Sequence, residues 1–347
     1  MTDFKNIHPA HAPHSVAALK PFPDVLHVVT VISNPVRYRS RYRHYRTFEK
    51  HVADAGAVLW TIEAAFADRP FEVTDADEPR DIQIRTRDEL WNKESLMNLA
   101  ANRLPPDAKY IAFIDADFIF SRQDWAQETI QQLQHYQAVQ MFSTVAYLNE
   151  DCECIRHRFG YLKAYHMFLA GKFNAFGEAN IPPMSGGYYR PGAPWTDCGA
   201  PGAAWAFRRE ALDRLGGLID VTILGSGDYF MAAALVGMMK RVLPAGYSDG
   251  LKRHLLNWQE RAERHVRRNV GIVQGTISHL WHGRLSERGY GIREQILVDY
   301  QFDPETDLKR DAHGLYQLED DGSERFMLMR DKIRAYFRSR NEDGVEE

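Results

Sequence analysis

Apolar and polar positions follow one another along the chain in blocks that are typical of strands and of helices. Short β-branched apolar runs, such as residues 25–33 (VLHVVTVIS), predict strands that are covered on both faces, as in a parallel sheet. Apolar residues at helical spacing, as in residues 90–104, predict helices with one buried face. The predicted strands are residues 25–33, 57–62, 81–86, 110–114, 138–142, 203–207 and 276–280. The predicted helices are residues 39–55, 90–104, 125–136, 208–215, 228–239, 251–268 and 325–338.

The order of these elements predicts an α/β fold with a mostly parallel central sheet flanked by helices, because strands and helices alternate through the first 150 residues. The alternation stops in residues 151–195, which are dense in Gly, Pro and aromatic residues. This stretch is too long for an ordinary connection, so we expect a loop excursion that faces the substrate.

Composition narrows the class of protein. The chain has 347 residues, 44% of them hydrophobic, and a formal net charge of -4, which argues against bulk-charge binding to nucleic acid. The first 23 residues lack the order of a secretion signal, and the longest apolar run, residues 229–239, is too short to span a bilayer. Three cysteines match neither a disulfide framework nor a spaced zinc site. We therefore expect a cytoplasmic protein with reduced thiols.

Two acids stand where a predicted strand ends. Asp115 and Asp117 follow the apolar run 110–114, and ligands of open α/β sheets bind beyond the carboxyl ends of the strands. In a strand, positions i and i+2 point to the same side, so both carboxylates could face one Mg²⁺ or Mn²⁺ ion. The alternative is a pair of solvated turn acids. Apolar residues 118–120 follow at once, which favours a metal site.

At this point the sequence resembles the nucleotide-sugar-dependent glycosyltransferases of the GT-A fold. Residues 91–98 (WNKESLMN) and 110–117 (YIAFIDAD) look like the β-1,4-galactosyltransferase pattern of F-N-R-A-K-L-L-N before an apolar strand that ends in D-V-D. Residues 35–39 (PVRYR) are similar to the P-F-R-x-R segment of that family. Residues 225–228 (GSGD) stand where such enzymes carry G-G-E-D, and residues 278–283 (SHLWHG) stand where a late histidine completes the metal site.

The resemblance implies a domain division as well. Residues 24–300 would form the GT-A domain, with a nucleotide-sugar-binding half (24–150) and an acceptor-binding half (151–300). Residues 1–23 would be an N-terminal extension and residues 301–347 a C-terminal one, whose FDPETD and GLY segments look like those of a bacterial and phage-encoded group.

The same resemblance assigns the reaction centre. Asp115 and Asp117 would hold Mn²⁺ (or Mg²⁺), with His279 as third ligand or His282 in its place. Asp228 would be the base that takes the proton of the attacking hydroxyl, which implies direct displacement with inversion. Gly227 departs from the family, which has Glu there, and this puts acceptor recognition in doubt more than catalysis.

Further residues are expected to bind the substrates. Those expected at the donor nucleotide are Arg37, Glu63, Trp91, Lys93 and Asp115. The aromatic residues that could stack on an acceptor are Tyr188, Tyr189, Trp195 and Trp205.

The predicted function is therefore transfer of a sugar from a nucleoside diphosphate, best matched by UDP, to a saccharide or other hydroxyl acceptor. Three alternatives stay open: the same fold working with retention, a modified DNA base as acceptor, and a non-catalytic sugar-nucleotide or carbohydrate-binding protein. The DNA alternative draws on residues 37–46, where arginines alternate with tyrosines. On a helix, however, Tyr38, Tyr42 and Tyr45 share one face, and we expect that face to pack inward.

Overall fold

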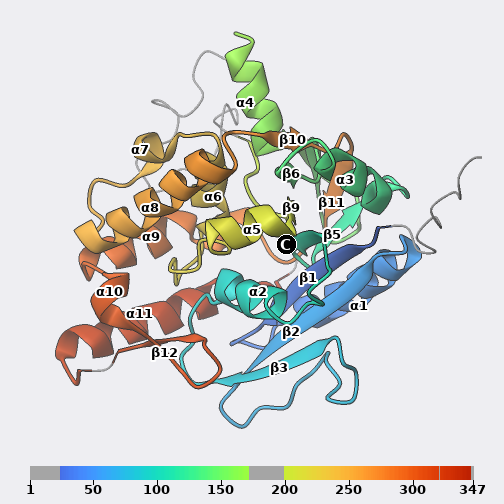
Figure 1. Cartoon of the computed structure of the whole chain (residues 1–347). Helices are drawn as coiled ribbons and strands as arrows, with labels where there is room; N and C mark the ends of the chain where they lie inside the picture. Colours follow the sequence, from blue (N-terminus) through green and yellow to red (C-terminus); the bar gives the residue numbers. More distant parts are fainter. Residues whose placement is uncertain (1–23, 172–198, 320, 345–347) are drawn as a thin grey trace, which may run out of the picture.

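A seven-stranded sheet forms the centre of the computed structural model, which describes residues 24–171, 199–319 and 321–344 (Figure 1). In spatial order its strands are β10 (Val270–Ile272), β6 (Ala138–Gln140), β9 (Ala204–Arg208), β4 (Tyr110–Ile114), β1 (Leu26–Ser33), β2 (Val58–Phe66) and β3 (Asp81–Thr86). Only β9 runs antiparallel to its neighbours. The predicted α/β fold with a mostly parallel sheet flanked by helices is confirmed.

A second sheet of four strands lies beyond the carboxyl end of β4. Its strands, in spatial order, are β5 (Phe118–Phe120), β11 (Thr276–His279), β7 (Thr144–Leu148) and β8 (Cys154–Phe159). The antiparallel pairing of β5 with β11 sets His279 opposite Phe118. This register brings the end of β11 beside the turn that carries Asp117.

Helices cover both faces of the central sheet. On one face lie α1 (Arg39–Asp54) and α3 (Trp125–Leu133), whose apolar residues share a core with the second sheet. The other face carries the larger core, to which these helices contribute: α2 (Lys93–Ala101), α5 (Arg209–Leu215), α6 (Gly227–Leu235), α8 (Asp249–His265), α9 (Tyr290–Asp299) and α11 (Glu324–Ser339). The remaining short elements are α7 (Met239–Val242), η1 (Leu285–Arg288), α10 (Pro304–Asp307) and the hairpin of β12 (Leu308–Arg310) with β13 (Tyr316–Leu318).

Helix α1 shows how the sequence selects its buried face. Tyr38 and Tyr45 are buried and Tyr42 is half-buried, whereas Arg43 and Arg46 are exposed. Burial of each large apolar side chain is worth about 1.5–3 kcal/mol, so this face outweighs the many polar residues of the helix. The tyrosines therefore pack inward, as predicted.

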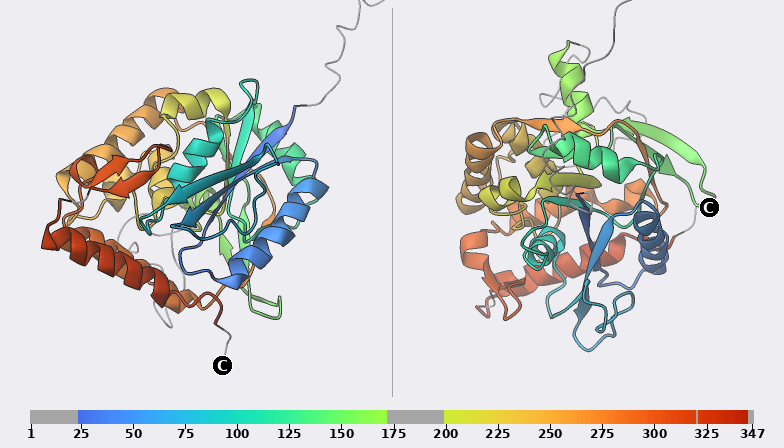
Figure 2. Two further views of the ribbon diagram at one scale, coloured as in Figure 1. Left: turned by 90° about the horizontal axis from the view of Figure 1, so that it is seen from below. Right: turned by 45° about the vertical axis from the view of Figure 1, so that its right-hand side comes forward.

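The stretch expected to be an irregular excursion is partly regular. It contains β8 and the helix α4 (Tyr161–Leu169), which projects from the body in Figures 1 and 2. Residues 172–198 of that stretch lie outside the described residues. The exposed cysteines Cys152 and Cys154 are not joined to any described residue by a disulfide. Cys198 lies outside the described residues.

The C-terminal residues pack along one side of the molecule, where Figure 2 shows α11 as a long helix. Phe326, Met329 and Ile333 are buried in the larger core. No helix among the described residues is long and apolar enough to cross a bilayer. The division into extensions and halves stays a prediction.

Candidate active site

The two acids that follow β4 point in different directions. Residues 115–117 form a turn between β4 and β5, so the alternation of a strand does not apply to them. The backbone of the turn is fixed at both ends, because Asp115 N donates to Ala203 O and Leu280 N donates to Asp117 O, each at 2.9 Å. Asp115 turns to Lys93 of α2, and Asp117 turns to two histidines.

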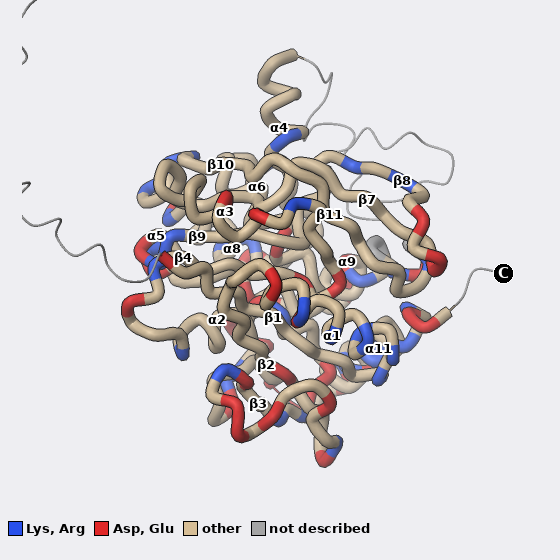
Figure 3. Tube along the Cα trace, turned by 90° about the vertical axis from the view of Figure 1, so that its right-hand side faces the viewer, with Lys and Arg blue, Asp and Glu red and all other residues tan. Residues whose placement is uncertain are grey.

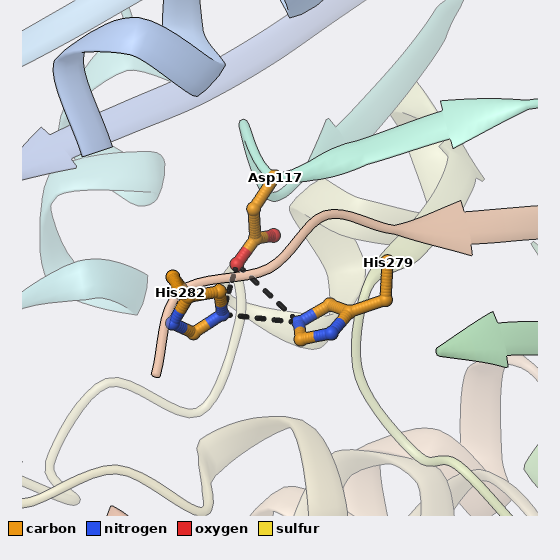
Figure 4. Close-up of side chains that lie close together, drawn as sticks. All are labelled: Asp117, His279 and His282. Carbon is orange, nitrogen blue, oxygen red and sulfur yellow. Dashed lines mark hydrogen bonds and ion pairs between the residues drawn. The ribbon is translucent and has the colours of Figure 1, made fainter. Parts of the chain in front are cut away.

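Asp117, His279 and His282 converge on one point, as Figure 4 shows. Asp117 Oδ2 lies 2.8 Å from His282 Nε2 and 3.5 Å from His279 Nε2, and the two Nε2 atoms are 3.1 Å apart. His279 ends β11 and His282 lies in the loop that follows. The structure therefore joins both histidines to Asp117, where the sequence left a choice between them.

The electrostatics of this triad suit a cation. Burial and nearby Arg288 lower the pKa of both histidines, that of His282 to about 3, so their rings are neutral. Burial opposes ionisation of Asp117, but hydrogen bonds from the histidines outweigh it and hold the pKa of its carboxyl well below the usual range. Neutral imidazole and ionised carboxylate are the forms that bind metals.

The geometry fits a metal ion as well. Neighbouring ligands of an octahedral ion with bonds of 2.0–2.1 Å are about 3 Å apart, close to the spacing of the three ligand atoms. Asp117 Oδ1 is buried and makes no hydrogen bond to a described residue. These three side chains could therefore hold a divalent ion, and Asp115 is not part of the group.

Asp115 instead belongs to a cluster around Lys93. Lys93 Nζ lies 3.1 and 3.2 Å from the two carboxylate oxygens of Asp115 and 3.6 Å from Glu94 Oε1. Burial alone would lower the pKa of Lys93. The nearby carboxylates of Asp115, Glu94 and Asp228 outweigh the effect of burial and raise the pKa of Lys93 above its usual value. Burial raises the pKa of Asp115 to about 6 against the opposing effect of Lys93.

Asp228 lies in the first turn of α6, behind a strained loop. Gly225 and Ser226 both have positive φ, 102° and 69°, a conformation that a serine rarely adopts. Helix α9 holds this loop, because Arg293 donates to Ser226 Oγ at 2.8 Å and Ser226 Oγ donates to Glu294. Asp228 Oδ1 accepts from the amide of Tyr229 at 2.8 Å, which fixes the direction of the carboxylate.

Two adjoining cavities meet at this set of residues. Cavity A is bordered by the end of β1, Trp91 and the C-terminal tail. Cavity B is bordered by Asp228 and by the metal triad of Asp117, His279 and His282. The residues that line both are Trp91, Lys93, Asp115, Asp117, His282 and Arg340. Cavity A thus reaches Asp117 and His282, and cavity B contains all three residues of the triad together with Asp228.

The C-terminal tail closes one wall of cavity A. Glu342 has no exposed side-chain surface and joins Arg41 at 2.6 and 2.7 Å and Arg340 at 2.6 Å. Phe337 stacks on Trp91 with ring centroids 6.3 Å apart and planes 5° from parallel, and Arg340 lies 5.0 Å from the same indole. Trp91 therefore already has packing partners on the tail.

Several predicted substrate-binding residues lie elsewhere. Arg37 is exposed and pairs with Glu72, and it lines neither cavity. The Glu63 carboxylate is buried, accepts from the amides of residues 72–74, and lines neither cavity. Both residues anchor the loop before β3 in this structure.

Among the residues predicted to bind the acceptor, Tyr188, Tyr189 and Trp195 lie outside the described residues. Trp205 is buried in β9, where its Nε1 donates to Pro201 O at 2.7 Å. It lines a small recess together with Asp228.

The structure adds residues that the sequence did not single out: Glu94, Arg41, Arg340, Glu342 and Arg293. Glu94 was within reach of sequence reasoning, because it stands next to Lys93 in the WNKES motif. The other four carried no local signal, since charged residues in helices are usually solvated.

No family model matches the chain, and no curated protein sequence matches it. Among solved structures, a Drosophila β1,4-galactosyltransferase 7 mutant in complex with manganese, UDP-Gal and xylobiose aligns with 86% of this chain and 95% of its own, at 10% identity and a TM-score of 0.37. TarS of S. aureus aligns over 71% of this chain and 73% of its own, at 7% identity and a TM-score of 0.36. Mouse xyloside xylosyltransferase 1 aligns over 73% of this chain and 97% of its own, at 12% identity and a TM-score of 0.27.

Proposed function

We propose that the protein is a metal-dependent glycosyltransferase that moves a sugar from a nucleoside diphosphate, most simply UDP, to a hydroxyl acceptor. The observation that carries the proposal is that one cavity holds both the Asp117, His279 and His282 triad and the carboxylate of Asp228. Displacement at a sugar carbon needs a metal ion beside the leaving diphosphate and a base beside the attacking hydroxyl, and one cavity offers residues for both roles. The sequence resemblance to GT-A enzymes supports the same assignment.

Cavity A is the proposed nucleotide site. It opens at the carboxyl ends of β1 and β4, the edge of an α/β sheet where ligands bind, and it reaches the metal triad through Asp117 and His282. Lys93 lines both cavities and would face the diphosphate. Trp91 also lines this pocket, with Phe337 stacked on its indole.

The chemistry follows from the residues of cavity B. Asp228 accepts the proton of the acceptor hydroxyl, whose oxygen attacks the anomeric carbon as the bond from that carbon to the diphosphate oxygen breaks. A divalent ion bound by Asp117, His279 and His282 would neutralise the leaving diphosphate. Direct displacement of this kind inverts the anomeric carbon. NMR of the product anomer separates it from the retaining alternative.

The donor set favours Mn²⁺ over Mg²⁺. Two of the three ligand atoms are imidazole nitrogens, whereas Mg²⁺ prefers oxygen ligands and dehydrates reluctantly. We therefore expect Mn²⁺ to support binding and turnover better than Mg²⁺.

The other readings receive less support. Basic and acidic residues both lie around β3 and near α11 in Figure 3, so no single sign of charge covers this side for a DNA backbone. A non-catalytic sugar-nucleotide-binding protein would not need Asp228 held rigidly in the same cavity. A cytoplasmic location stays a prediction from the sequence.

Calorimetric titration of Mn²⁺, and of UDP with and without Mn²⁺, tests the proposal, with GDP as a second nucleotide. We expect wild-type protein to bind UDP only with Mn²⁺, and Asp117→Asn to lose at least about 10-fold in Mn²⁺ affinity. Asp115→Asn is the matched comparison, because it removes an equal charge two residues away and leaves the triad intact. Its loss of Mn²⁺ affinity should be clearly smaller. Equal losses in both variants would argue against the triad, and absence of metal-dependent binding to either nucleotide would remove the transferase assignment.

Asp228→Asn tests the base separately. The variant should bind Mn²⁺ and UDP like wild type but transfer sugar about 10²–10⁴-fold more slowly, the usual contribution of a positioned general base. The measurement is transfer from radiolabelled UDP-sugars to a panel of saccharides. Unchanged turnover would show that Asp228 is not the base.

A further inference from the structure

Glu94 is a buried acid that the proposed mechanism does not use. It lies in the first turn of α2 and is only 4% exposed, yet it lines cavity B and the small recess that holds Trp205. Its Oε1 makes no hydrogen bond to any residue among those described, and its nearest cation, Lys93 Nζ, stays 3.6 Å away. A buried carboxyl oxygen without a hydrogen bond is costly, and a ligand group that bonds to it is one explanation for such an atom.

The chain makes room for this carboxyl. A Cβ at Gly227 would lie 2.9 Å from Glu94 Cδ and 2.8 Å from Ile219 O, so no side chain fits at position 227 beside Glu94. Gly227 immediately precedes Asp228. The absence of a side chain at position 227 thus lets Glu94 reach the same cavity wall as Asp228.

The surroundings of Glu94 match a sugar ring. The apolar lining of the recess beside it includes Phe113, Trp205 and Leu218. Its charged lining consists of Lys93, Glu94, Asp115 and Asp228. A pyranose presents apolar C–H faces and a rim of hydroxyl groups, and binding sites of this kind combine apolar walls with a few placed polar groups. Burial, opposed by Lys93, raises the pKa of Glu94 to about 7, so near neutral pH the group can either accept or donate a hydrogen bond.

We propose that Glu94 is a sugar-binding residue whose carboxyl holds a hydroxyl group of the transferred sugar. The inference rests on the proposed function, because it takes cavity B to be the place of the donor sugar. Lys93 lines both cavities and so lies where the proposed nucleotide site joins cavity B. Because Glu94 is next to Lys93, its partner is more simply the donor sugar than the acceptor.

The test compares the affinity for intact donors with the affinity for UDP, both in the presence of Mn²⁺. Wild type, Glu94→Gln and Glu94→Ala are titrated with UDP, UDP-glucose, UDP-galactose and UDP-N-acetylglucosamine. A hydrogen bond to a charged group is worth about 1.5–3 kcal/mol, which corresponds to a loss of roughly 10- to 100-fold. We expect Glu94→Ala to lower the ratio of UDP-sugar to UDP affinity by this factor for at least one sugar, with a smaller loss in Glu94→Gln and UDP affinity within about two-fold of wild type.

Asp307→Asn serves as the control, since Asp307 is an equally buried acid that pairs with Arg325 and lines neither cavity. It should leave the ratio unchanged. The inference is overturned if the ratio is the same in wild type and Glu94→Ala for all three sugars, or if UDP affinity falls as much as that of the sugars, which would indicate a structural role. Failure of wild-type protein to bind UDP with Mn²⁺ is a different result and would count against the proposed function itself.

Discussion

At the scale of single residues, neighbouring acids of this site differ because their surroundings differ. Asp117 is ionised among two histidines, whereas burial raises the pKa of Asp115 to about 6 and that of Glu94 to about 7. The two acids of the D-x-D motif are therefore not equivalent. One is a metal ligand in the proposed site, and the other balances Lys93 at the junction of the cavities.

The raised pKa of Glu94 predicts a pH-dependent cost to stability. The folded protein binds this proton more tightly than the unfolded chain, whose value is near 4.5, so the free energy of unfolding falls as pH rises from about 4.5 to about 7. Glu94→Gln removes this decline. As pH rises through that window, the free energy of unfolding of the variant should increase relative to that of wild type by up to about 3 kcal/mol, at about 1.4 kcal/mol per pH unit. Urea denaturation at pH 5 and pH 8 measures the gain. Stability curves that stay parallel would contradict the prediction.

At the scale of elements, the sequence predicted those whose own residues determine their form. β1 is a continuous apolar run and α2 has apolar residues at helical spacing, and both occur within a few residues of their predicted bounds. Strands β5 and β10 have three residues each, and they become strands by pairing with partners that are distant in sequence. The antiparallel direction of β9 likewise depends on the path of the chain before it, which a local pattern does not encode.

The candidate site likewise contains residues that the sequence predicted and residues that only the fold brings together. The D-x-D motif and the two histidines marked Asp117, His279 and His282 from sequence alone. The prediction that Asp115 and Asp117 point to the same side assumed that the strand continues to Asp117. The chain turns at Asp115 instead. Glu342 approaches Arg41 across 301 positions of sequence, so only the fold brings them together.

The tail that borders cavity A gives an element-scale prediction. Buried Glu342 joins buried Arg340 and half-buried Arg41, and removal of the carboxylate leaves both arginines uncompensated. We expect Glu342→Gln to lower the free energy of unfolding by about 3–5 kcal/mol and to raise hydrogen exchange in residues 336–344. Glu305→Gln, which breaks the exposed pair with Arg253, is the control and should change neither quantity measurably. Equal effects of the two substitutions would show that the tail does not depend on Glu342.

At the scale of the whole molecule, the two predicted halves are interwoven. Strand β9 comes from the second half but lies between β4 and β6 of the first, and it supplies the hydrogen bonds on both sides. The larger core joins Val29, Phe230 and Phe326, which belong to the first half, the second half and the C-terminal residues. The metal triad spans the same division, with Asp117 in one half and both histidines in the other.

This arrangement predicts that residues 24–150, the predicted nucleotide-binding half, do not fold alone. A fragment of residues 24–150 would leave the facing edges of β4 and β6 without the strand that joins them, and exposed apolar edges of this kind aggregate rather than fold. We expect the fragment to lack near-UV circular dichroism and to show no cooperative urea transition, whereas the full chain unfolds in a single one. Co-expression with residues 151–347 should yield a complex that binds Mn²⁺, because only the two fragments together supply Asp117, His279 and His282. A sharp unfolding transition in the isolated fragment would instead show that the first half is an independent domain, and the metal site would then form by docking of two folded units.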